Sequence, residues 1–413
     1  MSGLYKWVAR RACRIVKWRA RQFVAPDLLS PHVKLVTELT DLQPDEMATV
    51  SMFGLRRLVL IANLNIPQCK KYRVLQKIEL LSSLGIEVVF SHWQDHFRSF
   101  RLMQLSSALI FYRIPFDDMF LSYLNEARRL GLAVGYDIDD PIFDEDIYGA
   151  NKNLAHLAPT EREHLIADAR NYAAAMDKAD YLVTSTGFLQ GVIRHRFDGK
   201  PVYRLQNFLD SESLACAAQL SELGRARSLD GRVVISYASG SRAHEADFRV
   251  AEEALARLMA THKHVDLQVL GYLKLPDSLR SFADRITQLS FTGHCGYLER
   301  LANSDIVIVP LVHDSFNDCK SAIRYLEAGL LSKAAVASNV GEFREAIFSG
   351  VNGVLCGPAE WFDALTKLVD DSDYRHRLGK AAHEHVLRGY VREAIKGRLS
   401  HDLNHLISGG GPV

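Results

Sequence analysis

The feature that most constrains the fold is a repeated alternation of short apolar runs with longer stretches of helical period. In the first half, the apolar runs lie at residues 58–62, 87–91, 108–112, 132–136 and 181–184. Helical periodicity occupies residues 73–84, 118–130, 160–179 and 187–196. Short apolar runs that are bounded by turns and separated by helices predict a parallel sheet with helices on both faces.

The same alternation begins again in the second half. Strands are predicted at residues 233–237, 265–270, 289–292, 305–309 and 334–338. Helices are predicted at residues 243–261, 276–286, 296–303, 321–331, 341–348, 358–370 and 373–389. Residues 208–231, which are polar and rich in Ala and Ser, separate the two series and are predicted to connect two domains.

The chain is therefore predicted to be an α/β protein with two Rossmann-like, doubly wound domains that face each other across a cleft. We assign residues 56–210 to the first domain and residues 211–390 to the second. Residues 391–413 are predicted to form a C-terminal helix and a flexible tail. Such sheets bind ligands beyond the carboxyl ends of their strands, so one substrate is expected on each side of the cleft.

Residues 1–55 form a basic extension before the first domain. Its first 26 residues contain seven Lys and Arg side chains and no acidic one, with Trp7 and Trp18 on an apolar stripe. This composition is typical of a helix at an anionic bilayer surface. A solvated helix, or one packed on a domain, has the same pattern. We expect a cytoplasmic protein, with the inner face of the cytoplasmic membrane as a second location.

Charge and cysteine content exclude several classes of protein. A net charge of +1 argues against a nucleic-acid-binding protein, which would be clearly basic. No apolar run reaches the roughly 18–20 residues of a spanning helix, and the N-terminus lacks the pattern of a secretory signal. The six cysteines have no CxxC or zinc spacing, so they are predicted to be free thiols in a reducing compartment, with no metal site.

A turn of small residues follows the first predicted strand of the second domain. Ser239, Gly240, Ser241 and Arg242 lie between that strand and the next helix, and His244 follows. Backbone amides in such a turn, together with the positive end of a helix, bind phosphate. Arg242 and His244 are placed to touch the same anion. An ordinary strand-to-helix turn has the same composition.

A second candidate segment follows the strand that ends at Pro310. Lys320 and Ser321 open a helix there, and Glu327 lies about two turns further on. A cation at a helix start suits a diphosphate, and a carboxylate can accept hydrogen bonds from both hydroxyls of a ribose. A solvated lysine and a capping glutamate are the alternative interpretation.

Together these segments resemble the donor-binding domain of GT-B glycosyltransferases, in particular the family 4-like, or group 1, enzymes. The landmarks occur in the family's order, and the resemblance spans roughly residues 56–395. They are VISYASGS at residues 234–241, VLG at 269–271, FTGH at 291–294, DIVIVP at 305–310, the segment 320–327, AAVAS at 334–338 and NG at 352–353.

The resemblance implies roles for individual residues. Ser239, Gly240, Arg242 and Lys320 would hold the donor diphosphate, Glu327 would hold the ribose, and Gly293 and His294 would border the base. The family's usual motif has a second Glu, where this chain has Cys319, and that Glu contacts the donor sugar. Asn317 or Asp318 is expected to substitute for it.

The first domain supplies the candidates for catalysis and for acceptor binding. Asp139 and Asp140 follow a predicted strand and are expected either to accept the acceptor's proton or to stabilise positive charge at the anomeric carbon. Helix capping is the alternative. Their DxD spacing is that of GT-A metal sites, but the two-domain pattern does not fit GT-A. Tyr72, Arg73 and Arg113 are predicted to contact the acceptor.

The sequence thus predicts a glycosyltransferase that moves a sugar from a nucleotide-diphosphate sugar to a glycan or lipid-linked acceptor in surface polysaccharide synthesis. Lys320, Arg242 and the glycine turn would stabilise the departing diphosphate without a metal or another cofactor. The resemblance also implies retention at the anomeric carbon. A nucleotide-sugar epimerase of the same fold and a catalytically inactive, membrane-associated subunit are the alternatives.

Overall fold

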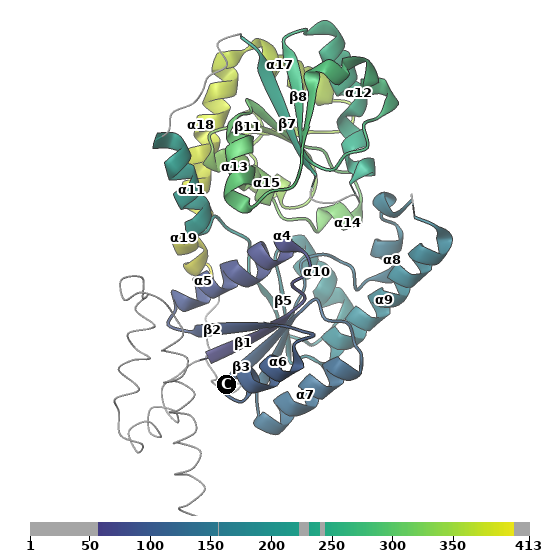
Figure 1. Cartoon of the computed structure of the whole chain (residues 1–413), viewed down its shortest axis with the longest axis vertical. Helices are drawn as coiled ribbons and strands as arrows, with labels where there is room; N and C mark the ends of the chain where they lie inside the picture. Colours follow the sequence, from purple (N-terminus) through teal and green to yellow (C-terminus); the bar gives the residue numbers. More distant parts are fainter. Residues whose placement is uncertain (1–56, 156, 223–230, 240–243, 400–413) are drawn as a thin grey trace, which may run out of the picture. The chain divides into compact units, whose positions relative to one another are not determined.

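The computed structural model describes residues 57–155, 157–222, 231–239 and 244–399. The basic extension, the predicted helix over residues 1–25 included, and the C-terminal tail from residue 400 lie outside this part of the chain. The described residues form two parallel six-stranded sheets with helices (Figure 1), which confirms the predicted fold class.

The first sheet has the strand order β2-β1-β3-β4-β5-β6. Its strands are β1 (Arg57–Ala62), β2 (Glu87–His92), β3 (Ala108–Tyr112), β4 (Ala133–Asp137), β5 (Tyr181–Thr184) and β6 (Val202–Arg204). The segments around it are α4 (Pro67–Cys69), the π-helical η2 (Lys70–Leu75), α5 (Gln76–Ser82), α6 (His96–Met103), α7 (Asp118–Leu130), α8 (Glu145–Gly149), the short η3 (Lys152–Leu154), α9 (Pro159–Lys178) and α10 (Gly187–Arg196).

Both faces of this sheet are buried, and successive residues of each strand face opposite sides of it. In β1, Val59 and Ile61 pack in a cluster with α7, α9 and α10, whereas Leu58 and Leu60 pack against η2 and α5. A strand buried on both faces must be apolar at every position. This requirement explains why the strands were recognisable in the sequence as continuous apolar runs.

The second sheet has the order β12-β11-β10-β7-β8-β9. Its strands are β7 (Val233–Ser239), β8 (Val265–Gly271), β9 (Ile286–Leu289), β10 (Ile306–Val309), β11 (Ala334–Ser338) and β12 (Val354–Cys356). Its helices are α12 (Glu245–Thr261), η4 (Asp277–Arg285), α13 (His294–Ala302), α14 (Ser315–Asp318), α15 (Ile323–Leu330), α16 (Phe343–Ala346), α17 (Trp361–Asp370) and α18 (Ser372–Gly389).

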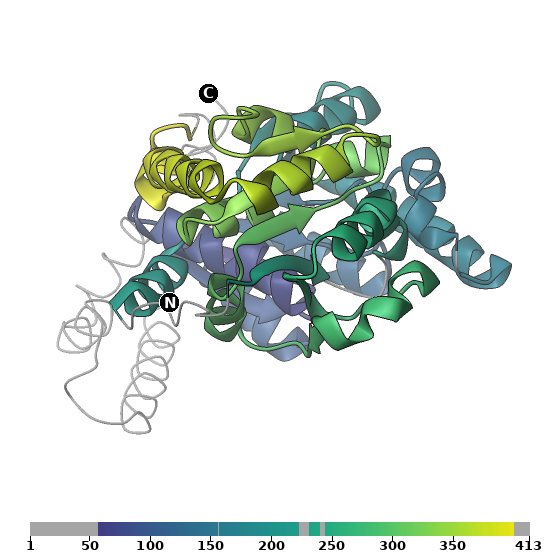
Figure 2. The same ribbon diagram turned by 90° about the horizontal axis from the view of Figure 1, so that it is seen from above.

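Helices cover both faces of the second sheet as well, as Figure 2 shows from above. Helices α12 and α17 pack on one face against Ile235 and Leu267, and α15 and α18 pack on the other against Val307 and Val309. Read from β9 to β12, the strand order is third, second, first, fourth, fifth, sixth, which is the Rossmann order.

Two segments link the domains. The segment predicted as a polar connection between the domains contains a helix, α11 (Ser211–Glu222), which the sequence patterns missed. Helix α19 (Arg392–Lys396) returns to the first domain, where Ile395 joins the apolar cluster of β1 and α5. The Lys396 ammonium donates to the Ser83 carbonyl at 2.9 Å.

Strand β9 begins and ends three residues before the predicted strand 289–292, and the sequence patterns missed the three-residue strands β6 and β12. Within the described ranges, no helix combines the length and the apolar character needed to span a bilayer.

Candidate active site between the two sheets

The carboxyl ends of the central strands of both sheets border one cavity of about 380 Å³. In each sheet the strand order reverses direction beside the first strand, between β1 and β3 and between β7 and β10. Such reversal points leave a crevice at the carboxyl ends of the strands, where doubly wound sheets bind ligands. The first domain contributes Tyr72, Arg113, Asp139 and Asp140 to its wall, and the second domain contributes His244, Lys320, Ser321 and Arg324.

Ion pairs join the two domains across this cavity. The Lys320 ammonium lies 2.9 Å from Asp140 Oδ1. The Arg113 guanidinium contacts the second oxygen of Asp140, and its Nε lies 2.7 Å from Asp139 Oδ1. The Tyr112 hydroxyl also donates to Asp139, at 3.0 Å. Two cations and two carboxylates, all at strand or helix ends, therefore form one continuous charged network.

The pairing decides what Asp140 can do chemically. Burial opposes ionisation of this carboxyl, but the Lys320 and Arg113 charges outweigh it and hold the pKa of Asp140 well below its usual range. Burial likewise opposes the charge on Lys320, and Asp140 raises the pKa of that ammonium. A carboxylate with a very low pKa is a weak proton acceptor. The geometry therefore favours an electrostatic role for Asp140 over that of a general base.

Arg113 has an unusual backbone conformation. Its φ is +49°, in the left-handed region that residues other than glycine rarely adopt. Such conformations cluster at functional sites, where the surrounding structure holds them in place. Here the Arg113 guanidinium is bound to Asp139 and Asp140 at the wall of the larger cavity.

Glu327 lies buried beside the cavity, where three side chains hold its carboxylate. The Tyr72 hydroxyl of the first domain donates to one oxygen. The Tyr297 hydroxyl, at 2.9 Å, and the Arg324 guanidinium, at 3.0 Å, donate to the other. Tyr72 was predicted to contact an acceptor, but the structure places its hydroxyl on the predicted ribose-binding carboxylate.

A second, smaller cavity of about 150 Å³ opens beside the first, at the ends of β7, β8 and β9. Ser239, Phe291, Gly293, His294 and Tyr297 are among the residues that line it. Phe291 is 58% exposed, which is unusual for a side chain of its size. An apolar wall with a few polar groups at strand ends suits a flat aromatic ring.

The start of α12 is held by a residue of the first domain. Asn153 Oδ1 accepts from the backbone amides of Ala246 and Asp247, at 3.1 and 3.3 Å. His244 pairs with Asp247 at 3.1 Å and lines the larger cavity. The predicted phosphate contacts Gly240, Ser241 and Arg242 lie outside the described residues.

One predicted donor-binding residue, Asn317, is buried in the protein instead, as is the cysteine that stands at the position of the family's second Glu. The Asn317 amide donates to Asp247 at 2.9 Å and to the Val312 carbonyl at 3.1 Å, and its side chain does not line either cavity. Cys319, at the position of the family's second Glu, packs in the apolar core of the first domain. Asn317 therefore stabilises the loop after β10, and neither side chain is placed to contact a sugar.

Arg73 does not fit the predicted acceptor contact. It is 1% exposed, and its guanidinium is bound to Asp137, to the Leu205 carbonyl and to Asn207. Asn207 in turn donates to the Ser321 hydroxyl at 3.0 Å. Arg73 thus supports the loop that carries Ser321 rather than the surface of the cleft.

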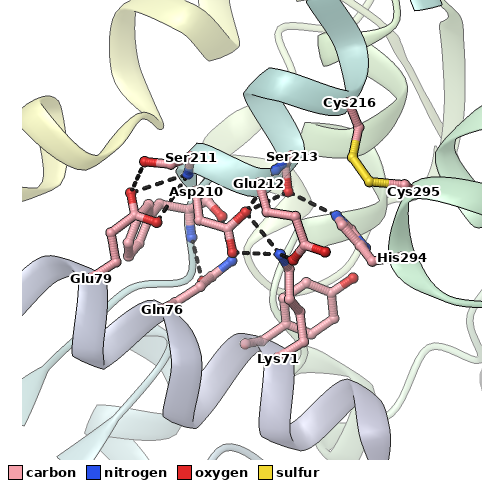
Figure 3. A network of polar contacts seen from close by, with 12 residues as sticks. Lys71, Gln76, Glu79, Asp210, Ser211, Glu212, Ser213, Cys216, His294 and Cys295 are labelled. Carbon is pink, nitrogen blue, oxygen red and sulfur yellow. Dashed lines mark hydrogen bonds and ion pairs between the residues drawn. A yellow bond between two sulfur atoms is a disulfide. The ribbon is translucent and has the colours of Figure 1, made fainter. Parts of the chain in front are cut away.

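The prediction that all cysteines are free thiols is wrong for two of them. Cys216 of α11 and Cys295 of α13 form a disulfide, which lies beside His294 (Figure 3). Their spacing of 79 residues gave no signal in the sequence. Cys69, Cys319 and Cys356 are free. Across the described part of the chain, no cluster of three or more His, Cys, Asp or Glu side chains could hold a metal ion.

Residues 232–371, which form most of the second domain, match the family model described as "Glycosyl transferases group 1". The second domain is a group 1 glycosyltransferase domain. The D-inositol 3-phosphate glycosyltransferase of Paenarthrobacter aurescens is 33% identical over 112 residues, 24% of this chain and 26% of that enzyme. The glycogen synthase of Mycobacterium tuberculosis is 27% identical over 165 residues, 38% of this chain and 39% of that enzyme.

These matches cover less than two fifths of the length of either curated relative. Over a longer span, the chain shares its fold with Anabaena HepE, solved in complex with UDP and glucose. That similarity has 13% identity and a TM-score of 0.58, and covers 84% of this chain and 99% of HepE. The pair of Rossmann-like domains is therefore a GT-B architecture around the group 1 domain.

Three residues of the site were missed by the sequence reasoning. Tyr297, Arg324 and Asn153 contact predicted site residues or cap α12. The i,i+3 spacing of Arg324 and Glu327 in a predicted helix was a usable signal for their pairing. Tyr297 and Asn153 are far from their partners in the sequence, so only the packing of the elements reveals them.

Proposed function

We propose that this protein is a glycosyltransferase that moves a sugar from a nucleotide-diphosphate sugar to an acceptor hydroxyl. The observation that carries the proposal is the cavity in which Lys320 and Ser321 of the second domain meet Arg113 and Asp140 of the first. One wall offers a cation and a hydroxyl for a diphosphate, and the other offers charged groups to an acceptor. The group 1 family match of the second domain supports the same activity.

In this proposal, Lys320 binds the donor diphosphate and stabilises the charge that develops as the sugar leaves. A preorganised cation aimed at a leaving group is among the strongest contributions to catalysis. Glu327 accepts hydrogen bonds from the ribose hydroxyls, and the smaller cavity takes the base. Asp139 and Asp140 hold Arg113 and stabilise positive charge at the anomeric carbon. Retention at that carbon and independence of metal are the expectations for this family.

A uridine nucleotide is the first donor to test, because the HepE structures that share the fold contain UDP or UDP-glucose.

Residues 1–26 carry basic side chains and no acidic one. This charge supports an acceptor at an anionic membrane surface, such as a lipid-linked glycan of surface polysaccharide synthesis. Co-sedimentation with anionic and neutral vesicles tests the membrane part, with a chain lacking residues 1–26 as control. Equal binding of both chains would contradict it.

The activity is tested first by thermal shift with UDP, GDP, dTDP, CDP and ADP. Binding at about 100 times Kd stabilises the native state by roughly 2.7 kcal/mol. The best nucleotide then defines the labelled donor for a transfer assay. The control variant Lys367→Ala removes a lysine that stacks on Tyr374, away from both cavities. Loss of shift and transfer in Lys320→Ala but not in the control supports the proposal, and no shift with any nucleotide contradicts it.

One observation favours a second candidate, a catalytically inactive glycosyltransferase-like subunit. Cys319 stands where the family has its sugar-contacting Glu, and it is buried. A subunit of this kind is expected to retain its biological role when Lys320 and Glu327 are both substituted. Complementation of a deletion strain by the double variant distinguishes the two functions.

A further inference from the structure

A chain of hydrogen bonds runs from the first domain to a wall of the smaller cavity (Figure 3). The Lys71 ammonium lies 2.7 Å from Asp210 Oδ2. Asp210 Oδ1 accepts from the Ser213 hydroxyl at 2.7 Å, and Ser213 Oγ lies 2.8 Å from His294 Nε2. His294 is the first residue of α13 and lines the cavity. The four side chains therefore form one relay that ends at an imidazole.

The relay fixes the direction of each hydrogen bond. Burial raises the pKa of the Asp210 carboxyl, but Lys71 and Ser213 outweigh burial and lower it, so this group is an ionised acceptor. The single hydroxyl proton of Ser213 is therefore directed to Asp210. Ser213 Oγ then has only lone pairs to offer to the ring, so the short contact to His294 requires a proton on Nε2.

The imidazole is neutral as well as oriented. Burial lowers the pKa of His294, and the Lys71 charge adds to this effect against the opposing influence of Glu327, Asp210 and Glu212. The positive end of α13 also disfavours a charged ring at the first helical position. A neutral imidazole with its proton on Nε2 has a free lone pair on Nδ1. Among the described residues, Nδ1 of His294 has no hydrogen-bond partner.

We propose that His294 is a specificity-determining residue whose Nδ1 accepts a hydrogen bond from a ring N–H of the nucleobase. Ser213 and Asp210 are its positioning residues. The inference rests on the proposed function, because that function assigns the base to this cavity. Uracil, thymine and guanine carry a ring N–H on their pairing edge, whereas cytosine and adenine carry an acceptor nitrogen there. The donor is therefore a uridine, thymidine or guanosine diphosphate sugar.

Calorimetric titration of UDP and CDP tests the selectivity, since the two differ only on the pairing edge of the base. GDP and ADP serve as the purine pair. We expect UDP to bind at least tenfold more tightly than CDP, or GDP to bind at least tenfold more tightly than ADP. In Ser213→Ala the ring is free to take either tautomer, and the ratio is expected to fall below about threefold. Ser211→Ala is the matched control, because that hydroxyl donates to Glu79 and not to His294.

An NMR experiment on the unliganded protein tests the tautomer without any nucleotide. Proteins labelled with ¹⁵N-histidine, with His294→Gln to assign the signal, are expected to show Nε2 protonated and Nδ1 unprotonated. A proton on Nδ1, equal binding of the two members of the pair that contains the tightest-binding nucleotide, or an unchanged ratio in Ser213→Ala would overturn the inference. If no nucleotide binds while the NMR result holds, the proposed function fails and the tautomer assignment stands.

Discussion

The Tyr72 hydroxyl of the first domain donates a hydrogen bond to the carboxylate of Glu327 in the second domain, 255 residues further along the chain. In the proposed function, the same carboxylate binds the ribose hydroxyls of the donor. A phenol and a ribose hydroxyl offer the same O–H donor to the same oxygen, so they compete for it. In the proposed function, a donor that binds Glu327 therefore replaces a hydrogen bond between the two domains.

Removing the Tyr72 hydroxyl is expected to tighten nucleotide binding. A net hydrogen bond contributes about 0.5–1.5 kcal/mol, so Tyr72→Phe should lower the Kd of the preferred nucleoside diphosphate by about two- to tenfold. Tyr374→Phe is the matched control, because that tyrosine lies beneath Lys367, away from Glu327 and both cavities. Titration calorimetry on both variants measures the effect. Weaker binding in Tyr72→Phe would mean that Tyr72 contacts the donor instead of competing with it.

Lys320→Ala should impair transfer far more than it impairs folding. Loss of a group that stabilises transition-state charge costs about 10²–10³-fold in rate. The variant leaves Asp140 paired with Arg113, so its carboxylate keeps a cationic partner and the fold is expected to persist. Steady-state kinetics and the denaturation midpoint give the two readouts. A variant that unfolds in parallel with its loss of activity would instead assign Lys320 a structural role.

The sequence predicted most strands of both sheets because their two buried faces require uninterrupted apolar residues. It missed Val202–Arg204 and Val354–Cys356, since three residues are too few for any periodicity. Helix α11 was missed because its buried face is small: only Ser213 and Cys216 are fully buried. A sequence pattern identifies an element whose buried residues form a long, regular series, and it misses an element in which only two or three residues are buried.

The sequence was sufficient to place three charged residues around the cleft, namely Asp140, Arg113 and Lys320. Each of them follows a strand whose carboxyl end faces the cleft. Their pairing with one another was not predictable, because it depends on how the two domains pack. Arg73 illustrates the opposite error. A basic residue at the start of a predicted helix was expected to face the cleft, but burial with Asp137 and Asn207 gives it a supporting role.

The disulfide between Cys216 and Cys295 predicts a thiol count and a change in stability. Unfolded, unreduced protein is expected to show two fewer reactive thiols than the same protein after reduction. The double variant Cys216→Ser/Cys295→Ser should be less stable by about 2–4 kcal/mol, since the bond closes a long loop of the unfolded chain. Chemical denaturation of reduced wild-type protein should match the double variant. Equal thiol counts before and after reduction would exclude the bond.

A buried lysine in the first domain predicts how stability depends on pH. Lys77 contacts Asp137, faces the ring of Tyr112 and lies beside Arg73. Burial and the Arg73 charge lower the pKa of this lysine from 10.5 to about 8, against the opposing effect of Asp137. Below pH 8, Lys77 is protonated in both the folded and the unfolded chain. Between pH 8 and 10.5 only the unfolded chain retains the proton, so folding releases one proton and stability rises with pH.

Lys77→Met removes this titration while keeping an unbranched side chain. The free energy of unfolding of the wild type, relative to that of Lys77→Met, is therefore expected to increase by about 2 kcal/mol between pH 8 and 10, since each pH unit contributes at most about 1.4 kcal/mol. Denaturant titrations at each pH measure this difference, and Lys367→Met corrects for the loss of one lysine from the surface. A difference that falls as the pH rises would mean that Lys77 stays protonated beside Asp137 and stabilises the fold as an ion pair.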